Sequence, residues 1–104
     1  MIRTVLRLEI APGCADRLVR LFQELQILET SAAQDGCHGA EIAVAKDGSH
    51  AIVTAMWEDE QAYASWTSRT DRGGQGEAIN EFLSTPLTPA TVGITYDVRH
   101  HAAT

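Results

Sequence analysis

The chain has 104 residues, of which 44% are hydrophobic and 21% are charged, a balance that predicts one globular domain over residues 1–104 with a single core. Fourteen acidic residues against eight basic ones give a formal net charge of −6, and no segment carries a run of like charge. Such a chain offers little to a phosphate backbone, so we expect no nucleic-acid partner.

The first predicted elements are a strand and a helix. Apolar and polar residues alternate over residues 3–10, which is the two-residue period of a strand. After a break at residues 11–13, apolar side chains recur at helical spacing in one stripe. The stripe consists of Cys14, Leu18, Leu21, Phe22, Leu25 and Leu28. Glycine is favoured at the position that follows a helix, so we predict one continuous helix that ends by Gly36.

Two further strands are expected next, joined by a tight turn. Residues 38–46 alternate, with Ala40 and Ile42 on one side, and residues 50–57 return as a third strand. Between them, the pair Asp47-Gly48 favours a type I′ hairpin. These strands should therefore be antiparallel neighbours.

A second helical region follows the third strand. Asp59 can cap a helix that begins with the next residue and places Tyr63 and Trp66 on one face. The glycine-rich residues 72–76 then predict an interruption, followed by a short helix over residues 77–83.

The chain is expected to close with a strand over residues 90–99, where Ile94 and Tyr96 alternate with polar neighbours. The resulting order of strand, helix, strand, strand, helix, strand predicts a ferredoxin-like α+β fold (βαββαβ). In that fold an antiparallel sheet carries its helices on one face.

The central strands have small or apolar side chains on both faces, among them Ala43, Val53 and Ala55. Helices would cover only one of these faces. In a chain this short, a symmetric sheet-to-sheet contact is the simplest way to bury the other. We therefore predict a homodimer joined through the sheets, with the last strand contributing across the interface.

Two segments resemble the antibiotic biosynthesis monooxygenase family: WEDEQAYASW at residues 57–66 and ITYDV at residues 94–98. The resemblance extends over nearly the whole chain. It implies a dimeric α+β barrel, and its best-known members oxidise anthrone-type aromatic polyketides to quinones with molecular oxygen and no metal or flavin. The haem-degrading branch is disfavoured, because Leu6 and Gly76 stand where that branch has an asparagine and a histidine.

Candidate site residues come partly from this resemblance and partly from chemistry. By resemblance Trp66 is the catalytic position, and Tyr63 and Trp57 are expected to line a slot for a flat aromatic ligand. The oxidation also needs a base, for which the candidates are His38 and His50 at the ends of strands. The remaining substrate-binding candidates are Arg72, Asn80 and Phe82, of which the first two could donate to an oxyanion.

Several signals of cofactor binding and export are missing from the sequence. There is no glycine-rich nucleotide loop after the first strand, no set of His, Cys or carboxylate residues at metal-ligand spacing, and no Cys-His haem motif. We therefore expect no cofactor and no metal. With no basic-then-apolar leader and no apolar run that could span a membrane, we expect a cytoplasmic protein.

Two functions remain open. One is a cofactor-independent monooxygenase that acts on an aromatic polyketide in antibiotic or pigment biosynthesis. The other is a non-catalytic ligand-binding or accessory module, such as a cyclisation helper. An aromatic-lined cavity with a tuned base would favour the monooxygenase, whereas a filled, collapsed cavity between the sheet and the helices would favour the accessory module.

Overall fold

The chain forms an antiparallel sheet covered by helices. The computed structural model describes residues 1–69, 73–88, 91 and 93–102. Its strands are β1 (Ile2–Glu9), β2 (Cys37–Val44), β3 (His50–Trp57) and β4 (Ile94–Asp97). Its helices are α1 (Ala15–Glu24), α2 (Ile27–Ala32), α3 (Glu60–Thr67) and α4 (Gly73–Asn80).

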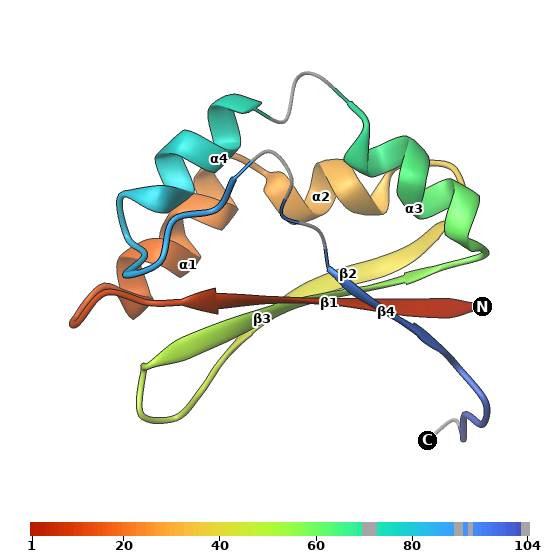
Figure 1. The fold of residues 1–104 in the computed structure, drawn as a ribbon, viewed down its shortest axis with the longest axis horizontal. Helices are drawn as coiled ribbons and strands as arrows, with labels where there is room; N and C mark the ends of the chain where they lie inside the picture. The colour runs from red at the N-terminus through yellow and green to blue at the C-terminus, as the bar shows by residue number, and fades with distance from the viewer. Residues whose placement is uncertain (70–72, 89–90, 92, 103–104) are drawn as a thin grey trace.

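The strands lie in the order β2-β3-β1-β4, and the helices cover one face of the sheet (Figure 1). This arrangement confirms the predicted ferredoxin-like α+β fold. Alternation in β1 explains why only one face is covered: Leu8 is buried beneath the helices and Arg7 is exposed on the other face. Leu8 pairs with Ala51 in β3, so inward-facing residues line up across the sheet.

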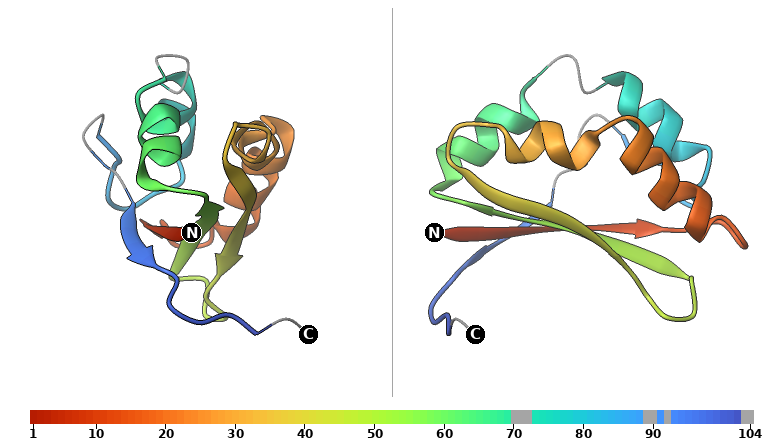
Figure 2. Two further views of the ribbon diagram at one scale, coloured as in Figure 1. Left: turned by 90° about the vertical axis from the view of Figure 1, so that its right-hand side faces the viewer. Right: turned by 180° about the vertical axis from the view of Figure 1, so that it is seen from behind.

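The helices form two rows above the sheet, which the end-on view in Figure 2 separates clearly. One row contains α1 and α2, and the other contains α3 and α4 (Figure 2). Buried apolar residues form two clusters beneath these rows. The first cluster includes Leu8, Leu18 and Phe22, and the second is centred on Trp57 and Trp66.

The single helix predicted up to Gly36 is wrong, because the chain forms α1 and α2 with a break between them. Gln26 adopts a left-handed conformation with φ of 51°, which no continuous helix can contain. The break redirects the chain, so that Ile27 is buried while Leu25, a member of the predicted stripe, is 42% exposed. After the bend, α2 therefore buries a different set of side chains from the one that a continuous helix would bury.

The turn between β2 and β3 also differs from the prediction. A type I′ turn centred on Asp47-Gly48 requires positive φ at both residues, yet only Gly48 of the pair has it, at 76°. The loop is longer: the backbone N–H of Gly48 donates to Ala45, and that of Ala45 donates to His50. The Asp47 side chain accepts from the Ser49 N–H at 2.9 Å, which stabilises the loop in place of the two-residue turn.

The glycine-rich segment does not precede the last helix as predicted, because α4 begins at Gly73 and includes Gly76. Glycine in a helix costs about 1 kcal/mol relative to alanine. Burial of Ile79 and Leu83, which are 7% and 8% exposed at and just after the end of α4, offsets that cost. Tertiary packing therefore overrides the local preference.

The remaining elements follow the prediction more closely. The predicted cap of the second helix is confirmed, since Asp59 Oδ1 accepts the N–H of Ala62 at 2.9 Å. The last strand is shorter than the predicted 90–99: β4 covers Ile94–Asp97, while residues 89, 90 and 92 lie outside the described part of the chain. In the ranges that the structure describes, no helix is long and apolar enough to cross a membrane.

Candidate functional site

A cavity of about 630 Å³ lies between the sheet and the two rows of helices. Its floor includes Thr4, Leu6, Val53, Ala55 and Trp57. One wall is formed by Phe22, Ile27, Leu28 and Ser31, and the opposite wall includes Tyr63, Trp66, Ile79 and Asn80. A mainly apolar cavity with a few polar groups has the composition of a small-molecule site.

Trp57 and Tyr63 form a continuous aromatic surface at one end of this cavity. The Trp57 ring is 0% exposed to solvent, and its Nε1 donates to Thr4 Oγ1 at 3.3 Å. The Tyr63 ring lies 5.7 Å from it, centre to centre, with an angle of 53° between the planes. This tilted contact holds both rings in fixed orientations. Because Trp57 has no accessible surface, it supports the half-buried Tyr63 ring from within the core, and Tyr63 faces the cavity.

The Tyr63 hydroxyl is held by the backbone of the segment before β4. The Gly93 N–H donates to Tyr63 Oη at 2.8 Å. A Cβ at Gly93 would lie 3.0 Å from that oxygen and 3.2 Å from the carbonyl oxygen of Val5, so the close approach depends on glycine. Because the hydroxyl is the acceptor in this bond, its own proton can be donated to a second group.

Trp66 and Arg69 form the part of the lining nearest the open side. The Trp66 ring is 8% exposed, and the Arg69 guanidinium stands 5.4 Å from its centre in a cation–π contact. Further polar residues surround this position along the rim: Thr67, Ser68, Gln75, Thr88 and Thr91. This contact places one positive charge beside Trp66 in the lining.

Comparison with known proteins places the chain in a family. The family model described as "Antibiotic biosynthesis monooxygenase" matches residues 1–72, more than half of the chain. The chain belongs to the antibiotic biosynthesis monooxygenase family. Among curated proteins, none matches the chain in sequence.

Solved structures share the fold at low sequence identity. A monooxygenase from the Streptomyces coelicolor gene ActVA-Orf6, solved in complex with nanaomycin D, is 21% identical, with a TM-score of 0.76 over 99% of this chain and 91% of that one. SnoaB, a cofactor-independent oxygenase from Streptomyces nogalater, is 15% identical, with a TM-score of 0.74 and coverage of 96% and 94%. Rv0793 from Mycobacterium tuberculosis is also 15% identical, with a TM-score of 0.75 and coverage of 98% of each chain.

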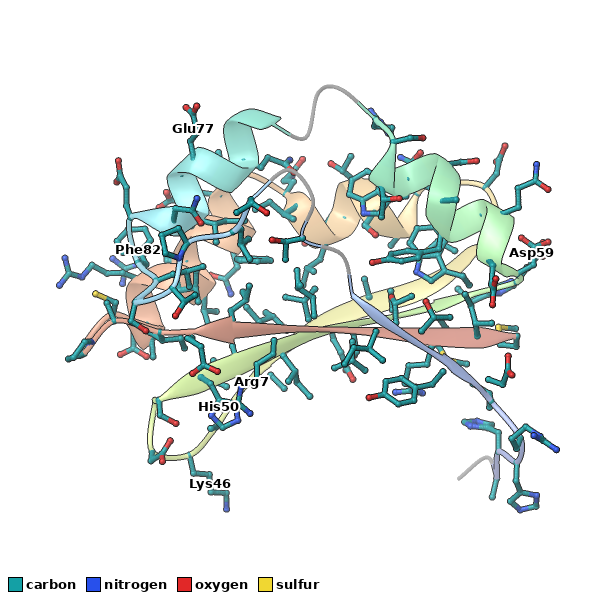
Figure 3. The ribbon with its side chains drawn as sticks, viewed as in Figure 1. Arg7, Lys46, His50, Asp59, Glu77 and Phe82 are labelled. Atoms are coloured by element: carbon teal, nitrogen blue, oxygen red, sulfur yellow. The ribbon has the colours of Figure 1, made fainter. Side chains whose placement is uncertain are left out.

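In this member of the antibiotic biosynthesis monooxygenase family, neither candidate histidine lines the cavity. His50 lies on the side of the sheet away from the helices (Figure 3), where its Nδ1 is 2.9 Å from Ser49 Oγ. His38 Nε2 lies 3.3 Å from a carboxylate oxygen of Glu58 and borders a separate hollow of about 290 Å³. That hollow also contains Arg3, whose position in β1 points away from the helices.

The His50 side of the sheet carries its own charged group. A hydrogen bond from Arg7 lowers the pKa of the Glu9 carboxyl. Desolvation opposes this shift, and the charges of Arg7 and His50 lower the pKa further by smaller amounts. Arg7 and His50 lie below the sheet in Figure 3, on the face opposite the cavity, and Glu9 shares this face because it pairs with His50. They therefore act outside the aromatic site.

The other sequence candidates have different outcomes. Asn80 lines the cavity, but its amide holds Leu87: Nδ2 donates to the Leu87 carbonyl at 3.0 Å, and Oδ1 accepts the Leu87 N–H at 2.7 Å. Phe82 packs against the core cluster and is absent from the described lining of the cavity. Arg72 lies outside the described residues.

Ionisable groups are scarce in the lining. Over the ranges that the structure describes, the cavity contains Tyr63, Arg69 and Glu77 but no histidine, aspartate or cysteine. The Glu77 side chain points away from the sheet (Figure 3). The described residues also contain no group of three or more His, Cys, Asp or Glu side chains that could hold a metal.

The sequence candidates omitted both buried polar residues of the described lining, Thr4 and Ser31, which are 5% and 6% exposed, as well as the more exposed polar residues near Trp66. A signal for Thr4 was present, because it occupies an inward position of β1 between apolar Ile2 and Leu6. No comparable signal existed for Ser31, because its burial depends on the break at Gln26.

Proposed function

We propose that this chain is a cofactor-independent, monooxygenase-like protein that oxidises an anthrone-type aromatic polyketide to a quinone in antibiotic or pigment biosynthesis. The observation that carries the proposal is the cavity of about 630 Å³ lined by Trp57, Tyr63 and Trp66 in a member of this family. A cavity of this size accommodates a flat ligand of several fused rings, within the usual range for small-molecule sites.

The proposed reaction needs only oxygen and an electron-rich ring system. The methylene carbon of the anthrone loses a proton, and the resulting enolate transfers electrons to O₂. The two combine as a hydroperoxide at that carbon, which then loses water to leave a carbonyl. One oxygen atom of O₂ enters the quinone and the other leaves as water, so no external reductant is consumed.

In this proposal the protein contributes orientation, exclusion of water and stabilisation of the enolate oxygen. Tyr63 would donate its proton to that oxygen, while the Gly93 N–H bond to Tyr63 Oη strengthens the donor. The rings of Trp66 and of Tyr63, which Trp57 supports from within the core, would hold the ligand faces and limit access of water. The proton lost from the methylene carbon would pass to solvent at the polar rim.

One observation favours the second candidate, a non-catalytic ligand-binding or accessory module. No histidine lies in the described lining, so His38 and His50 of the same chain do not approach a ligand there. Without a resident base, the cavity would bind the same aromatic ligand and position it for another enzyme. The two candidates predict the same ligand and differ in turnover.

Oxygen consumption with 1,8-dihydroxyanthrone separates the candidates, with the spontaneous oxidation rate subtracted. The proposed monooxygenase should consume one O₂ for each quinone formed, and Tyr63→Phe should lower kcat by on the order of 10² if the hydroxyl stabilises the oxyanion. Tyr96→Phe, at the other tyrosine, removes a hydroxyl on the sheet face away from the cavity; it is the matched control and should leave the rate unchanged. Saturable binding without oxygen consumption would support the accessory module and refute the monooxygenase.

We also propose that the chain is a homodimer joined through the sheets. The sheet face away from the helices exposes three large apolar side chains: Ile52 at 36%, Ile94 at 62% and Tyr96 at 49%. Exposed apolar residues grouped on one face are typical of an interaction surface. Sedimentation analysis should find a dimer at micromolar concentration, which Ile94→Glu should dissociate.

Leu25→Glu is the control for this experiment, because Leu25 is also exposed, at 42%, but belongs to the helical layer. It should leave the dimer intact. A parent chain that sediments as a monomer would refute the proposed assembly.

A further inference from the structure

Ser31 is a buried hydroxyl that opens onto the cavity. Its side chain lies on α2, in the wall opposite Tyr63 and Trp66, and the residue is 6% exposed. A serine inside a helix often donates to the carbonyl four residues earlier, here Ile27. Within the described part of the chain, however, Ser31 Oγ forms no hydrogen bond. No fully buried side-chain oxygen of the described residues lacks a partner, so Ser31 Oγ is reached from the cavity, where a ligand or water can pair with it.

Other hydroxyls surround the same end of the cavity. Thr4 in β1 is 5% exposed and accepts a hydrogen bond from Trp57 Nε1, so its own proton remains available to a second group. Ser31 belongs to this end because α2 leads into β2, where Cys37 pairs with Trp57. Tyr63 extends from α3 toward Trp57, as their ring contact shows.

We infer that Ser31 is a specificity residue that selects an aromatic ligand with hydroxyl or carbonyl oxygens on the edge that enters the Trp57 end of the cavity. This inference rests on the proposed function, because it assumes that the cavity takes a flat aromatic ligand. The apolar walls bind the faces of the rings, whatever their substituents. The hydroxyls of Ser31, Thr4 and Tyr63 distinguish a hydroxylated edge from an apolar one of the same shape.

The physical basis of this selection is asymmetric. An oxygenated edge exchanges its hydrogen bonds with water for bonds to Ser31 and Thr4, so little is lost when it enters the cavity. An apolar edge of equal size removes water from both hydroxyls and leaves them without partners. Sites with buried polar groups reject such analogues more strongly than purely apolar sites do.

Two ligands of matched size test this inference: 1,8-dihydroxyanthraquinone and 1,8-dichloroanthraquinone. Their binding can be followed by quenching of Trp57 and Trp66 fluorescence, since both rings line the cavity. In Ser31→Ala, the Kd of the dihydroxy compound should rise about three- to tenfold. The Kd of the dichloro compound should stay unchanged or fall, because its edge no longer leaves the Ser31 hydroxyl without a partner. Ser65→Ala, at an exposed position of α3, is the matched control and should change neither value.

A second pair of variants separates the hydroxyl from side-chain size. Ser31→Thr and Ser31→Val are nearly equal in shape, and only threonine keeps the hydroxyl. Ser31→Thr should therefore keep the preference for the dihydroxy ligand and Ser31→Val should lose it, with circular dichroism confirming that both fold. If Ser31→Ala and Ser31→Val keep the parent's preference, the inference is wrong and the proposed ligand class stands. If the parent binds neither compound, the proposed function fails together with it.

Discussion

Replacing Trp66 by phenylalanine distinguishes a ligand-binding wall from ordinary core packing. Trp66 is only 8% exposed, so the smaller ring leaves unfilled space beside the existing cavity and loses part of the contact with Arg69. We expect a loss of about 1 to 2 kcal/mol in the free energy of unfolding, because the site can partly relax. For a domain of about 100 residues this corresponds to a fall in Tm of about 5 to 15 °C.

If Trp66 also stacks on the ligand, affinity should fall independently of stability. An aromatic contact contributes about 0.5 to 1.5 kcal/mol beyond its buried area, so the Kd for 1,8-dihydroxyanthraquinone should rise about three- to tenfold. Trp57 remains in the variant as the fluorescent reporter in the cavity. The titration must be run well below the Tm of the variant, where nearly all of the protein is folded.

Phe82→Leu is the control for this experiment, because Phe82 packs against the core cluster without joining the described lining of the cavity. It should lower Tm and leave the Kd unchanged. The reasoning is refuted if Trp66→Phe loses stability while its folded fraction binds with the parent's affinity. Trp66 would then be a core residue, and the ligand would contact other parts of the lining.

Three further predictions concern stability and titration. Gly93→Ala should lower Tm by several degrees, because a Cβ would lie 3.0 Å from Tyr63 Oη; an unchanged Tm in a thermal melt would show that the segment simply shifts. Asp59→Ala should cost about 1 kcal/mol in urea unfolding through loss of the helix cap, whereas Asp59→Asn should retain most of it. Glu9 should titrate below the ordinary glutamate range by carboxyl NMR, and Arg7→Gln should raise its pKa, since the Arg7 hydrogen bond is the main cause of the shift. A lowered folded-state pKa contributes stability above the unfolded-state pKa, and this contribution is lost as pH falls through the folded-state value; a Glu9 pKa unchanged by Arg7→Gln would contradict the assignment.

The sequence by itself determined the four strands and the order of strands and helical regions. The third strand was predicted at residues 50–57 and observed as His50–Trp57, because alternation and turn residues act between near neighbours. The cap at Asp59 was predictable for the same reason: its side chain reaches an N–H only three residues away. The spacing of Tyr63 and Trp66 likewise placed both on one helix face, and both line the cavity.

Tertiary structure alone decided which polar groups reach the cavity. Apolar residues occupy both faces of β3, so alternation could not tell which face the helices cover, and His50 proved to lie on the other one. The sequence predicted Asn80 as a ligand-binding residue, but its side-chain amide is hydrogen-bonded to the backbone of Leu87. Ser31 entered the lining because Gln26 adopts a left-handed conformation that breaks the helix. Such choices depend on packing between distant segments, which local periodicity does not contain.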